Sequence, residues 1–128
     1  MKNYKELMIW RKGIELGKVI YGLSNSFPKE EKYGIISQIT RAAVSIPANI
    51  AEGSSRISDK DYCRFLQIAL GSAFEVQTYL VIAKEMGWID ENDYNQAEVF
   101  LEEEIKMIHG FKRKLTDSQP SPPPVIRS

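Results

Sequence analysis

The chain has 128 residues, of which 43% are hydrophobic and 27% are charged, a composition typical of one globular domain and not of a disordered segment. Seventeen basic and seventeen acidic residues give a net charge of zero, which argues against a dedicated nucleic-acid binder. A single cysteine cannot form an internal disulfide. No run of ~18 uninterrupted apolar residues is present, which argues against a membrane span. The first thirteen residues are charged throughout, which argues against a signal peptide. We therefore expect a cytoplasmic protein with no membrane partner.

Apolar residues recur with helical spacing along the chain, without an alternating strand pattern or a tight hairpin turn. The spacing predicts four helices, at residues 4–24, 28–53, 58–86 and 90–115. Pro28 suits the first turn of the second helix. Gly53 and Gly87 suit the ends of the second and third helices, and Ser58 and Asp90 suit N-caps. Short connections between long helices predict an all-α, up-down antiparallel four-helix bundle.

The last residues differ in composition from everything before them. Residues 117–128 contain four of the six prolines and no core pattern. Such a segment is typical of a disordered or extended tail. We therefore expect residues 1–116 to form the bundle and residues 117–128 to form a Pro-rich disordered tail.

The predicted first helix carries two apolar stripes, whereas a helix of an isolated bundle needs only one. One stripe contains Leu7, Trp10, Ile14 and Tyr21, and the other contains Ile9, Leu16, Ile20 and Leu23. The third and fourth helices carry similarly broad apolar surfaces. Extra apolar surface of this kind often marks a subunit interface, so we favour an oligomer over the alternative, a single wide core-facing surface.

Charge is distributed unevenly along the chain. Residues 1–25 have a net charge of +3, whereas residues 90–128 have a net charge of −3. One interpretation is that solvated helix faces complement one another. The other is a basic face of the first helix that binds nucleic-acid phosphates without reading sequence. Its candidate nucleic-acid-binding residues are Lys5, Arg11, Lys12 and Lys18.

The second helix combines an apolar face with a polar stripe and an internal proline. The stripe contains Gln38, Arg41, Ser45, Asn49 and Glu52, and we interpret it as structural and at least half covered by neighbouring helices. Because a covered charge needs a partner, we expect Arg41 to pair with a carboxylate of another helix, such as Glu75. Pro47 leaves the carbonyl of Ala43 without its amide donor, which predicts a kink in the second helix at Pro47.

Catalytic and metal-binding patterns are missing from the sequence. His109 is the only histidine, so neither a His/Cys zinc cluster nor a pair of Glu-x-x-His motifs can form. No Gly-rich phosphate loop is present. The acidic run at residues 102–104 is typical of a solvated face. We expect no catalytic residue, no metal and no cofactor, and therefore a protein that is not an enzyme.

Four segments carry a resemblance to a known family. They are WRKGIEL at residues 10–16, FPKEEKYG at 27–34, QITRAAVSIPANIAEG at 38–53 and FLQIALGSAFE at 65–75. With these segments the sequence resembles the four-helix-bundle proteins named for 23S rRNA intervening sequences. The resemblance implies a ring of five subunits. It also implies a similarity to accessory proteins of diversity-generating retroelements, which work with a reverse transcriptase and nucleic acid. It implies no catalytic residues.

The sequence therefore predicts a non-enzymatic, ring-forming assembly or adaptor module whose first partner is itself, as a homopentamer. Sequence-tolerant binding of RNA or DNA through the basic face of the first helix, or binding of a nucleic-acid-processing protein, is a further hypothesis. The alternative is a purely structural protein–protein scaffold with no nucleic-acid role. Light scattering distinguishes an oligomer from a monomer. Titration with labelled RNA distinguishes a nucleic-acid-binding module from a purely structural scaffold.

Overall fold

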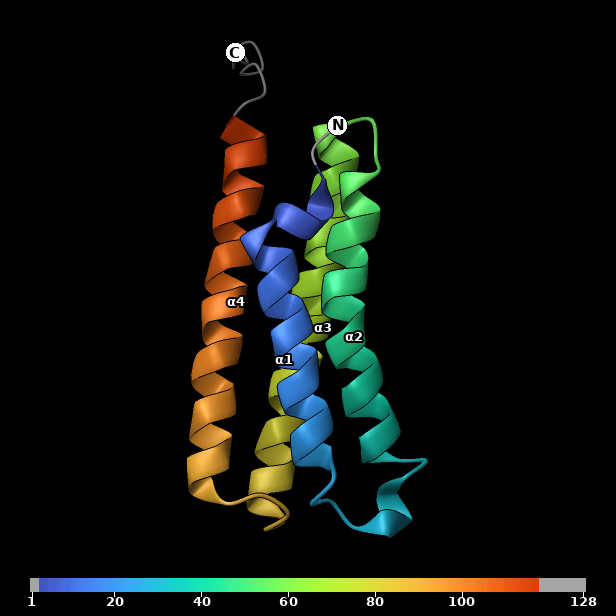
Figure 1. Ribbon diagram of the computed structural model, residues 1–128, viewed down its shortest axis with the longest axis vertical. Coiled ribbons are helices and arrows are strands. Elements are labelled where there is room, and N and C mark those ends of the chain that lie inside the picture. The colour runs from blue at the N-terminus through green and yellow to red at the C-terminus, as the bar shows by residue number, and fades with distance from the viewer. Residues whose placement is uncertain (1–2, 118–128) are drawn as a thin grey trace, which may run out of the picture.

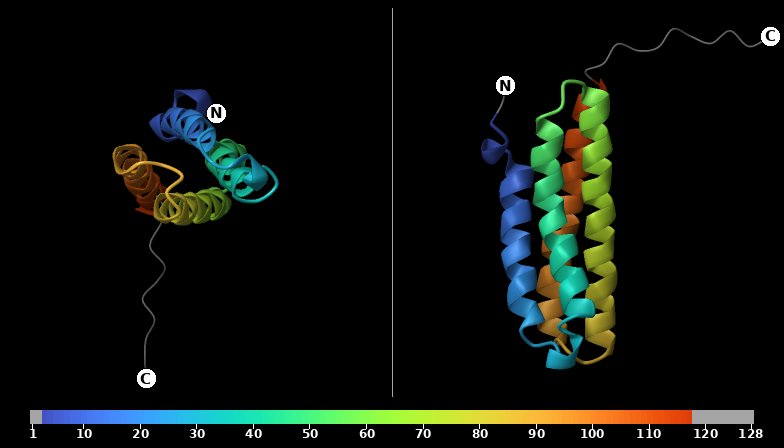
Figure 2. Two further views of the ribbon diagram at one scale, coloured as in Figure 1. Left: turned by 90° about the horizontal axis from the view of Figure 1, so that it is seen from below. Right: turned by 90° about the vertical axis from the view of Figure 1, so that its right-hand side faces the viewer.

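The computed structural model describes residues 3–117, which form an up-down bundle of four α-helices (Figure 1). The elements are η1 (Tyr4–Glu6), α1 (Met8–Ser24), η2 (Lys29–Glu31), α2 (Ile35–Ser54), α3 (Asp59–Glu85) and α4 (Glu91–Asp117). Seen along its axis, the bundle is a four-cornered array in which α1 lies across from α3, and α2 across from α4 (Figure 2). The prediction of an all-α antiparallel four-helix bundle is confirmed. The predicted Pro-rich tail lies outside the described residues, apart from Asp117, which ends α4.

Two of the predicted helices begin later than expected. The chain forms η1 and then an extended residue, Leu7 (φ −73°, ψ 131°), before α1 begins. Pro28 is also extended (φ −57°, ψ 139°) and precedes η2, so the second helix begins at Ile35. Proline fixes φ but not ψ, and it therefore fits a turn as well as a first helical turn. The turn buries the preceding side chain, Phe27, against the core.

The predicted caps of α3 and α4 are present. The hydroxyl of Ser58 accepts a hydrogen bond from the amide of Asp61 at 3.1 Å. The carboxylate of Asp90 accepts one from the amide of Asp93 at 2.7 Å. Gly87 follows α3 with φ +76°, a conformation that favours glycine. These contacts satisfy amides that the first helical turn leaves free, and they fix where both helices begin.

Gly53 has a different role from the one predicted. It does not end α2, which continues through Ser54. A Cβ atom at residue 53 would lie 2.8 Å from Cδ1 of Tyr62 and 2.9 Å from Cβ of Phe65. Glycine is needed here because the end of α2 approaches the beginning of α3 too closely for any side chain.

The hydrophobic core runs the length of the bundle and takes side chains from all four helices. Its fully buried large aliphatic side chains are Leu16, Ile20, Ile39, Ile46, Ile50, Leu66, Leu70, Val76, Leu80, Leu101 and Ile108. In α1 the core takes Ile9, Leu16 and Ile20 of one predicted stripe. The other stripe of α1 contributes only partly buried or exposed residues, and apolar surface is therefore left outside the core.

By length and composition alone, α3 could cross a membrane. Core helices of soluble proteins pass the same test. The residues of α3 that face the other helices are buried, among them Leu66, Leu70 and Leu80, whereas Arg64 and Glu85 are exposed. We therefore interpret α3 as one of the four core helices of the bundle and not as a membrane span.

Candidate functional site

The middle of the polar stripe on α2 forms a hydrogen-bonded contact with α3. Asn49 and Ser45 are half-buried, and the Asn49 side chain donates to the carbonyl of Ser45 at 2.8 Å and to its hydroxyl at 2.9 Å. The buried hydroxyl of Ser72 on α3 donates to the same Ser45 oxygen at 2.8 Å. This set of bonds fixes the register of α2 against α3, which agrees with a structural interpretation of these two stripe residues.

The other three stripe residues lie at the surface. Gln38, Arg41 and Glu52 are exposed, so the expectation that neighbouring helices cover them is wrong. Arg41 forms no ion pair with Glu75, which is itself exposed, or with any other acid among residues 3–117. An exposed guanidinium keeps its hydration and needs no protein partner.

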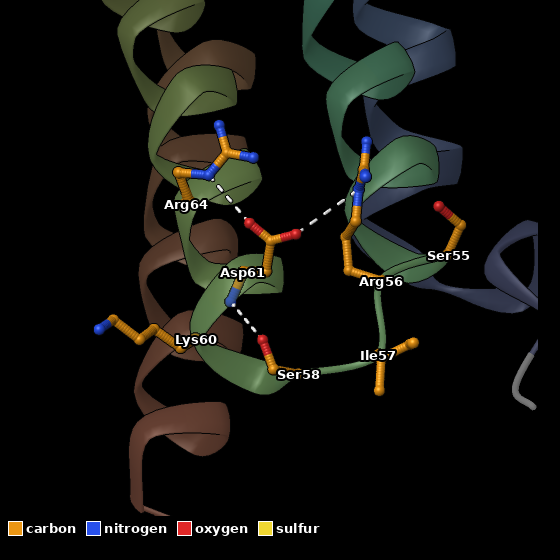
Figure 3. Close-up of a pocket in the computed structure, with 7 residues that line it drawn as sticks. All are labelled: Ser55, Arg56, Ile57, Ser58, Lys60, Asp61 and Arg64. Atoms are coloured by element: carbon orange, nitrogen blue, oxygen red, sulfur yellow. Dashed lines mark hydrogen bonds and ion pairs between the residues drawn. The ribbon is translucent and has the colours of Figure 1, made fainter.

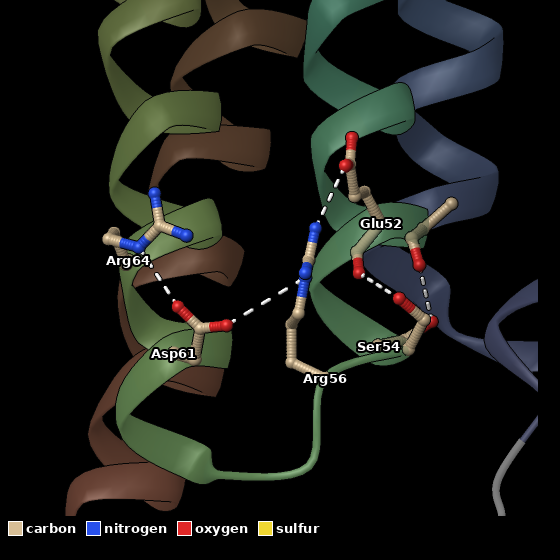
Figure 4. A network of polar contacts seen from close by, with 7 residues as sticks. Glu52, Ser54, Arg56, Asp61 and Arg64 are labelled. Atoms are coloured by element: carbon tan, nitrogen blue, oxygen red, sulfur yellow. Dashed lines mark hydrogen bonds and ion pairs between the residues drawn. The ribbon is translucent and has the colours of Figure 1, made fainter.

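The turn between α2 and α3 holds a chain of ion pairs (Figure 4). Arg56 reaches Glu52 at 3.0 Å and Asp61 at 3.8 Å, and Arg64 reaches Asp61 at 2.9 Å. Both guanidinium groups also lie over the ring of Phe65, at 4.4 and 4.6 Å from its centroid. The network ties the end of α2 to the first turn of α3, although exposed pairs of this kind contribute only about 0–1 kcal/mol each.

An open cavity of about 680 Å³ lies at this turn (Figure 3). Its lining residues are Ser55, Arg56, Ile57, Ser58, Lys60, Asp61 and Arg64. Asp61 already engages both arginines, whereas Lys60 points away from the network (Figure 3). Among the described residues the cavity has mixed charge and none of its lining side chains is buried, so we assign it a structural role.

The predicted basic residues of α1 are partly neutralised within the bundle. Lys12 forms an ion pair with Glu103 of α4 at 2.6 Å and lies 4.2 Å from the centroid of the Phe100 ring. Lys18 lies 3.5 Å from Glu15. In the described part of the chain, Lys5 and Arg11 form no ion pair, and both are exposed. Within the described residues, the predicted basic face of the first helix therefore presents two cations without an ion pair, Lys5 and Arg11, instead of four.

Glu104 is the polar residue that sequence reasoning missed. The expected solvated face includes Glu102 and Glu103, but Glu104 is fully buried. Neither of its oxygens has a hydrogen-bond partner within residues 3–117. Burial raises the pKa of its carboxyl from 4.5 to about 8, although the positive charge of Lys12 acts in the opposite direction. The spacing from Leu101, three residues before, places Glu104 on the core stripe of α4 and could have revealed this.

The Glu104 carboxyl lies next to Gly13 of α1, which is itself packed against Pro47 of α2. A Cβ atom at Gly13 would lie 3.0 Å from Oε2 of Glu104 and 3.2 Å from Cβ of Pro47. Pro47 is buried within an unbroken α2, and the predicted kink there stays a prediction. Gly13 and Pro47 thus lie between the buried carboxyl and the outside of the bundle.

An apolar groove of about 420 Å³ lies on the outer side of this approach, between α1 and α2. Its lining residues are Trp10, Gly13, Ile14, Gly17, Lys18, Tyr21, Val44, Pro47 and Ala48. Three of the four residues of one predicted α1 stripe, Trp10, Ile14 and Tyr21, line this groove. Tyr21 and Val44 are 52% and 44% exposed, so the groove is open to solvent and has the character of a contact surface.

Residues 3–117 contain no group of three or more His, Cys, Asp or Glu side chains that could hold a metal ion. His109 is exposed on α4. Cys63 is half-buried and is 3.9 Å from the carbonyl of Lys112. These residues give no candidate metal or catalytic site within the described part of the chain, and the apolar groove is the candidate site considered below.

The fold and this groove describe a small, all-helical bundle with an open apolar groove between α1 and α2. A family model for the 23S rRNA-intervening sequence proteins matches residues 5–110, and the chain belongs to this family. It is also similar to a solved protein of unknown function from the S23 ribosomal protein family of Bacteroides thetaiotaomicron. The two chains share 26% identity with a TM-score of 0.77, over 83% of this chain and 99% of that one. No curated protein matches the chain.

Proposed function

We propose that the protein is a non-enzymatic assembly module that self-associates through the apolar groove between α1 and α2. The observation that carries the proposal is the exposure of Tyr21 and Val44 beside Trp10 and Ile14 in one open groove. Burying apolar surface contributes about 25 cal/mol per Å², so covering the groove with another subunit is favourable. The resemblance to ring-forming relatives supports a homopentamer, and we propose that the protein acts in the cytoplasm.

Light scattering after gel filtration tests this proposal. The variant Tyr21→Glu/Val44→Glu places two charges in the groove at positions that are already half-exposed, so the fold is retained. We expect the wild-type protein to elute as an oligomer and the variant as a monomer of 14.6 kDa. Ile57→Glu is the matched control, because Ile57 is fully exposed in the α2–α3 turn, away from the groove. A wild-type monomer at micromolar concentration contradicts the proposal.

Sequence-tolerant nucleic-acid binding is a second candidate function, supported by the cations at one end of the bundle. The end that holds the α2–α3 turn and the end of α4 (top of Figure 1) contains Arg56, Lys60, Arg64, Lys112, Arg113 and Lys114. Within the described chain, Lys60, Arg113 and Lys114 form no ion pair. A ring would repeat this end several times and so raise its affinity for a polyanion.

Titration of labelled RNA and single-stranded DNA at low and physiological salt tests the second candidate. We expect binding that weakens with salt. Lys60→Glu/Arg113→Glu/Lys114→Glu tests the bundle end, and Lys5→Glu/Arg11→Glu/Lys12→Glu/Lys18→Glu tests the first-helix face. Loss of binding in either variant identifies the surface used. No binding by the wild-type protein at low salt leaves the alternative, a protein–protein scaffold, or an adaptor for a nucleic-acid-processing protein.

A further inference from the structure

We infer that a cavity at the end of the bundle, between the last turn of α4 and the beginnings of α1 and α3, binds the proline-rich segment of the same chain, residues 118–126. The inference goes beyond the proposed function, because it concerns a contact within one chain and applies to a monomer as well as to a ring. It follows from the aromatic wall of the cavity, from an unpaired hydroxyl in that wall and from the place where α4 ends.

The cavity has a mainly apolar wall. It has a volume of about 450 Å³ and lies at the end of the bundle that holds the α2–α3 turn and the end of α4 (top of Figure 1). Leu7, Tyr62, Phe111 and Leu115 line it, and all four are half-buried and packed against the core. The rings of Tyr62 and Phe111 meet at 58°, with their centroids 5.5 Å apart. A wall of two aromatic rings and two leucines suits an apolar occupant.

Tyr62 supplies a hydrogen-bond donor that the bundle does not use. Its hydroxyl oxygen is buried, yet it has no hydrogen-bond partner within residues 3–117. Burial raises the pKa of this phenol to about 12, so the hydroxyl keeps its proton at neutral pH. A hydroxyl that loses its water without gaining a partner destabilises the fold. An occupant that offers a carbonyl oxygen removes this penalty.

The charged groups at the cavity give little preference for an ion. Arg56 is already paired with Glu52 and Asp61. Lys114 is exposed, and the carboxylate of Asp59 lines the same cavity. Because cations and a carboxylate share the rim, an uncharged occupant is favoured over a phosphate or a carboxylate.

Residues 118–126, SQPSPPPVI, have the matching chemistry. They contain four prolines, one valine, one isoleucine and no charged residue. Because proline has no N–H group, such a segment offers mainly carbonyl acceptors. Runs of proline favour the polyproline II conformation, which is largely preformed and packs on aromatic-lined grooves. The aromatic wall and the free donor of Tyr62 are the two features that a segment of this kind requires.

The connection between the segment and the cavity is short. Leu115 lines the cavity, and Asp117 is the last described residue. From Phe111 to Asp117, α4 rises ~9 Å at 1.5 Å per residue. The five residues that follow, up to Pro122, span ~15 Å when extended, which is enough to turn back and place the proline run against Phe111. So short a tether gives an effective concentration in the millimolar range, which favours the chain's own segment over that of another copy.

Backbone dynamics of the full chain test whether the segment is bound. Pro122→Gly/Pro123→Gly/Pro124→Gly removes the proline run without changing a residue of the bundle, so the fold is retained. We expect NMR order parameters of the Val125 and Ile126 amides above about 0.6 in the wild type and below about 0.6 in this variant. Wild-type values as low as those of the variant contradict the inference.

A double-mutant cycle tests whether the segment contacts Tyr62. Tyr62→Phe removes only the hydroxyl, and each chain is measured by urea denaturation with and without the three glycine substitutions. We expect Tyr62→Phe to raise the unfolding constant about 3- to 10-fold when the prolines are present, and to have no such effect when they are absent. Tyr33→Phe, at an exposed tyrosine before α2, is the matched control and should act equally in both chains. An equal effect of Tyr62→Phe in both chains contradicts the contact.

Photo-crosslinking tests whether the contact lies within one chain. A photoreactive phenylalanine analogue replaces Val125, and this chain is refolded from urea together with an isotope-labelled copy of the wild-type chain. We expect cross-links to the unlabelled peptides that contain Tyr62 or Phe111. Cross-links to the labelled copies contradict binding within one chain, and cross-links only to other parts of the bundle contradict the choice of cavity. A wild-type monomer in light scattering would overturn the proposed assembly and leave this test unchanged.

Discussion

Glu104 is a buried carboxyl whose burial carries an electrostatic cost in the folded protein. Its carboxyl is fully buried, no described residue hydrogen-bonds it, and its pKa is raised from 4.5 to about 8. The folded protein therefore holds a proton that the unfolded chain releases near pH 4.5. Below pH 4.5 the carboxyl is protonated in both states and does not lower the free energy of unfolding. As the pH rises from 4.5 to about 8, the free energy of unfolding falls by about 1.4 kcal/mol per pH unit.

Replacing Glu104 by glutamine should remove this pH dependence. Glu104→Gln keeps the shape of the protonated carboxyl, so we expect stability close to wild type at pH 5 and clearly higher than wild type at pH 9. Urea denaturation at pH 5, 7 and 9 measures the difference. Glu102→Gln is the matched control on the exposed side of α4 and should retain the wild-type slope. An equal slope in wild type and Glu104→Gln between pH 5 and 8 contradicts the burial of an isolated carboxyl.

Two glycines on helices should respond in opposite ways to alanine. Gly53→Ala places a Cβ atom within 3 Å of Tyr62 and Phe65, and we expect a loss of about 1–3 kcal/mol in the free energy of unfolding. Gly71→Ala, at an exposed position of α3 with no described atom within 4 Å of the new Cβ, should gain about 0.5–1 kcal/mol. Thermal denaturation of both variants checks this. A stabilised Gly53→Ala variant would show that α2 and α3 are farther apart there.

At the scale of elements, α2 and α3 are joined by hydrogen bonds that converge on Ser45. Ser45→Ala leaves the buried Ser72 hydroxyl without its acceptor, so we expect a loss of about 1–3 kcal/mol. Ser72→Ala removes the donor instead and should cost about 0.5–1.5 kcal/mol. Ser37→Ala, on the same helix and without a described side-chain hydrogen bond, is the control. Equal stability of Ser45→Ala and Ser37→Ala in urea would contradict a fixed register between the two helices.

The helices were predictable from spacing because period and caps act within one helix. Ser58, Asp90 and Gly87 are examples in which the sequence alone locates a boundary correctly. The late start of α2 was not predictable in this way, because Pro28 is compatible with both a turn and a helix. The close contact of Gly53 depends on residues of α3, and no pattern within α2 reports it.

The candidate site was predictable in part for the same reason. The α1 stripe that contains Trp10, Ile14 and Tyr21 correctly indicated apolar surface outside the core, and these three residues line the groove. The four cations of α1 look equivalent in the sequence, but Lys12 is paired with Glu103, which lies ninety-one residues away. The burial of Glu104 depends on the opposite helices in the same way. Interactions between helices decide which charges remain free for a partner.

At the scale of the whole molecule, the proposed self-association rests on the apolar groove between α1 and α2, which leaves Tyr21 and Val44 half-exposed. Exposed charge at the rim of this groove, such as Lys18, should make assembly sensitive to salt, because exposed charges are screened. If charges at the rim dominate, we expect the oligomer to dissociate at a higher protein concentration in 0.5 M salt than in 0.15 M salt, because screening weakens the contact. If apolar burial dominates, we expect dissociation in 0.5 M salt at an equal or lower protein concentration. A dilution series at the two salt concentrations distinguishes these contributions.

Sedimentation equilibrium of the wild-type protein at pH 7 and physiological salt, over a range of micromolar concentrations, tests self-association most directly. The proposed ring predicts a mass that is a multiple of the 14.6 kDa chain, with five chains at saturation. A mass of one chain at every concentration would contradict the proposed assembly function.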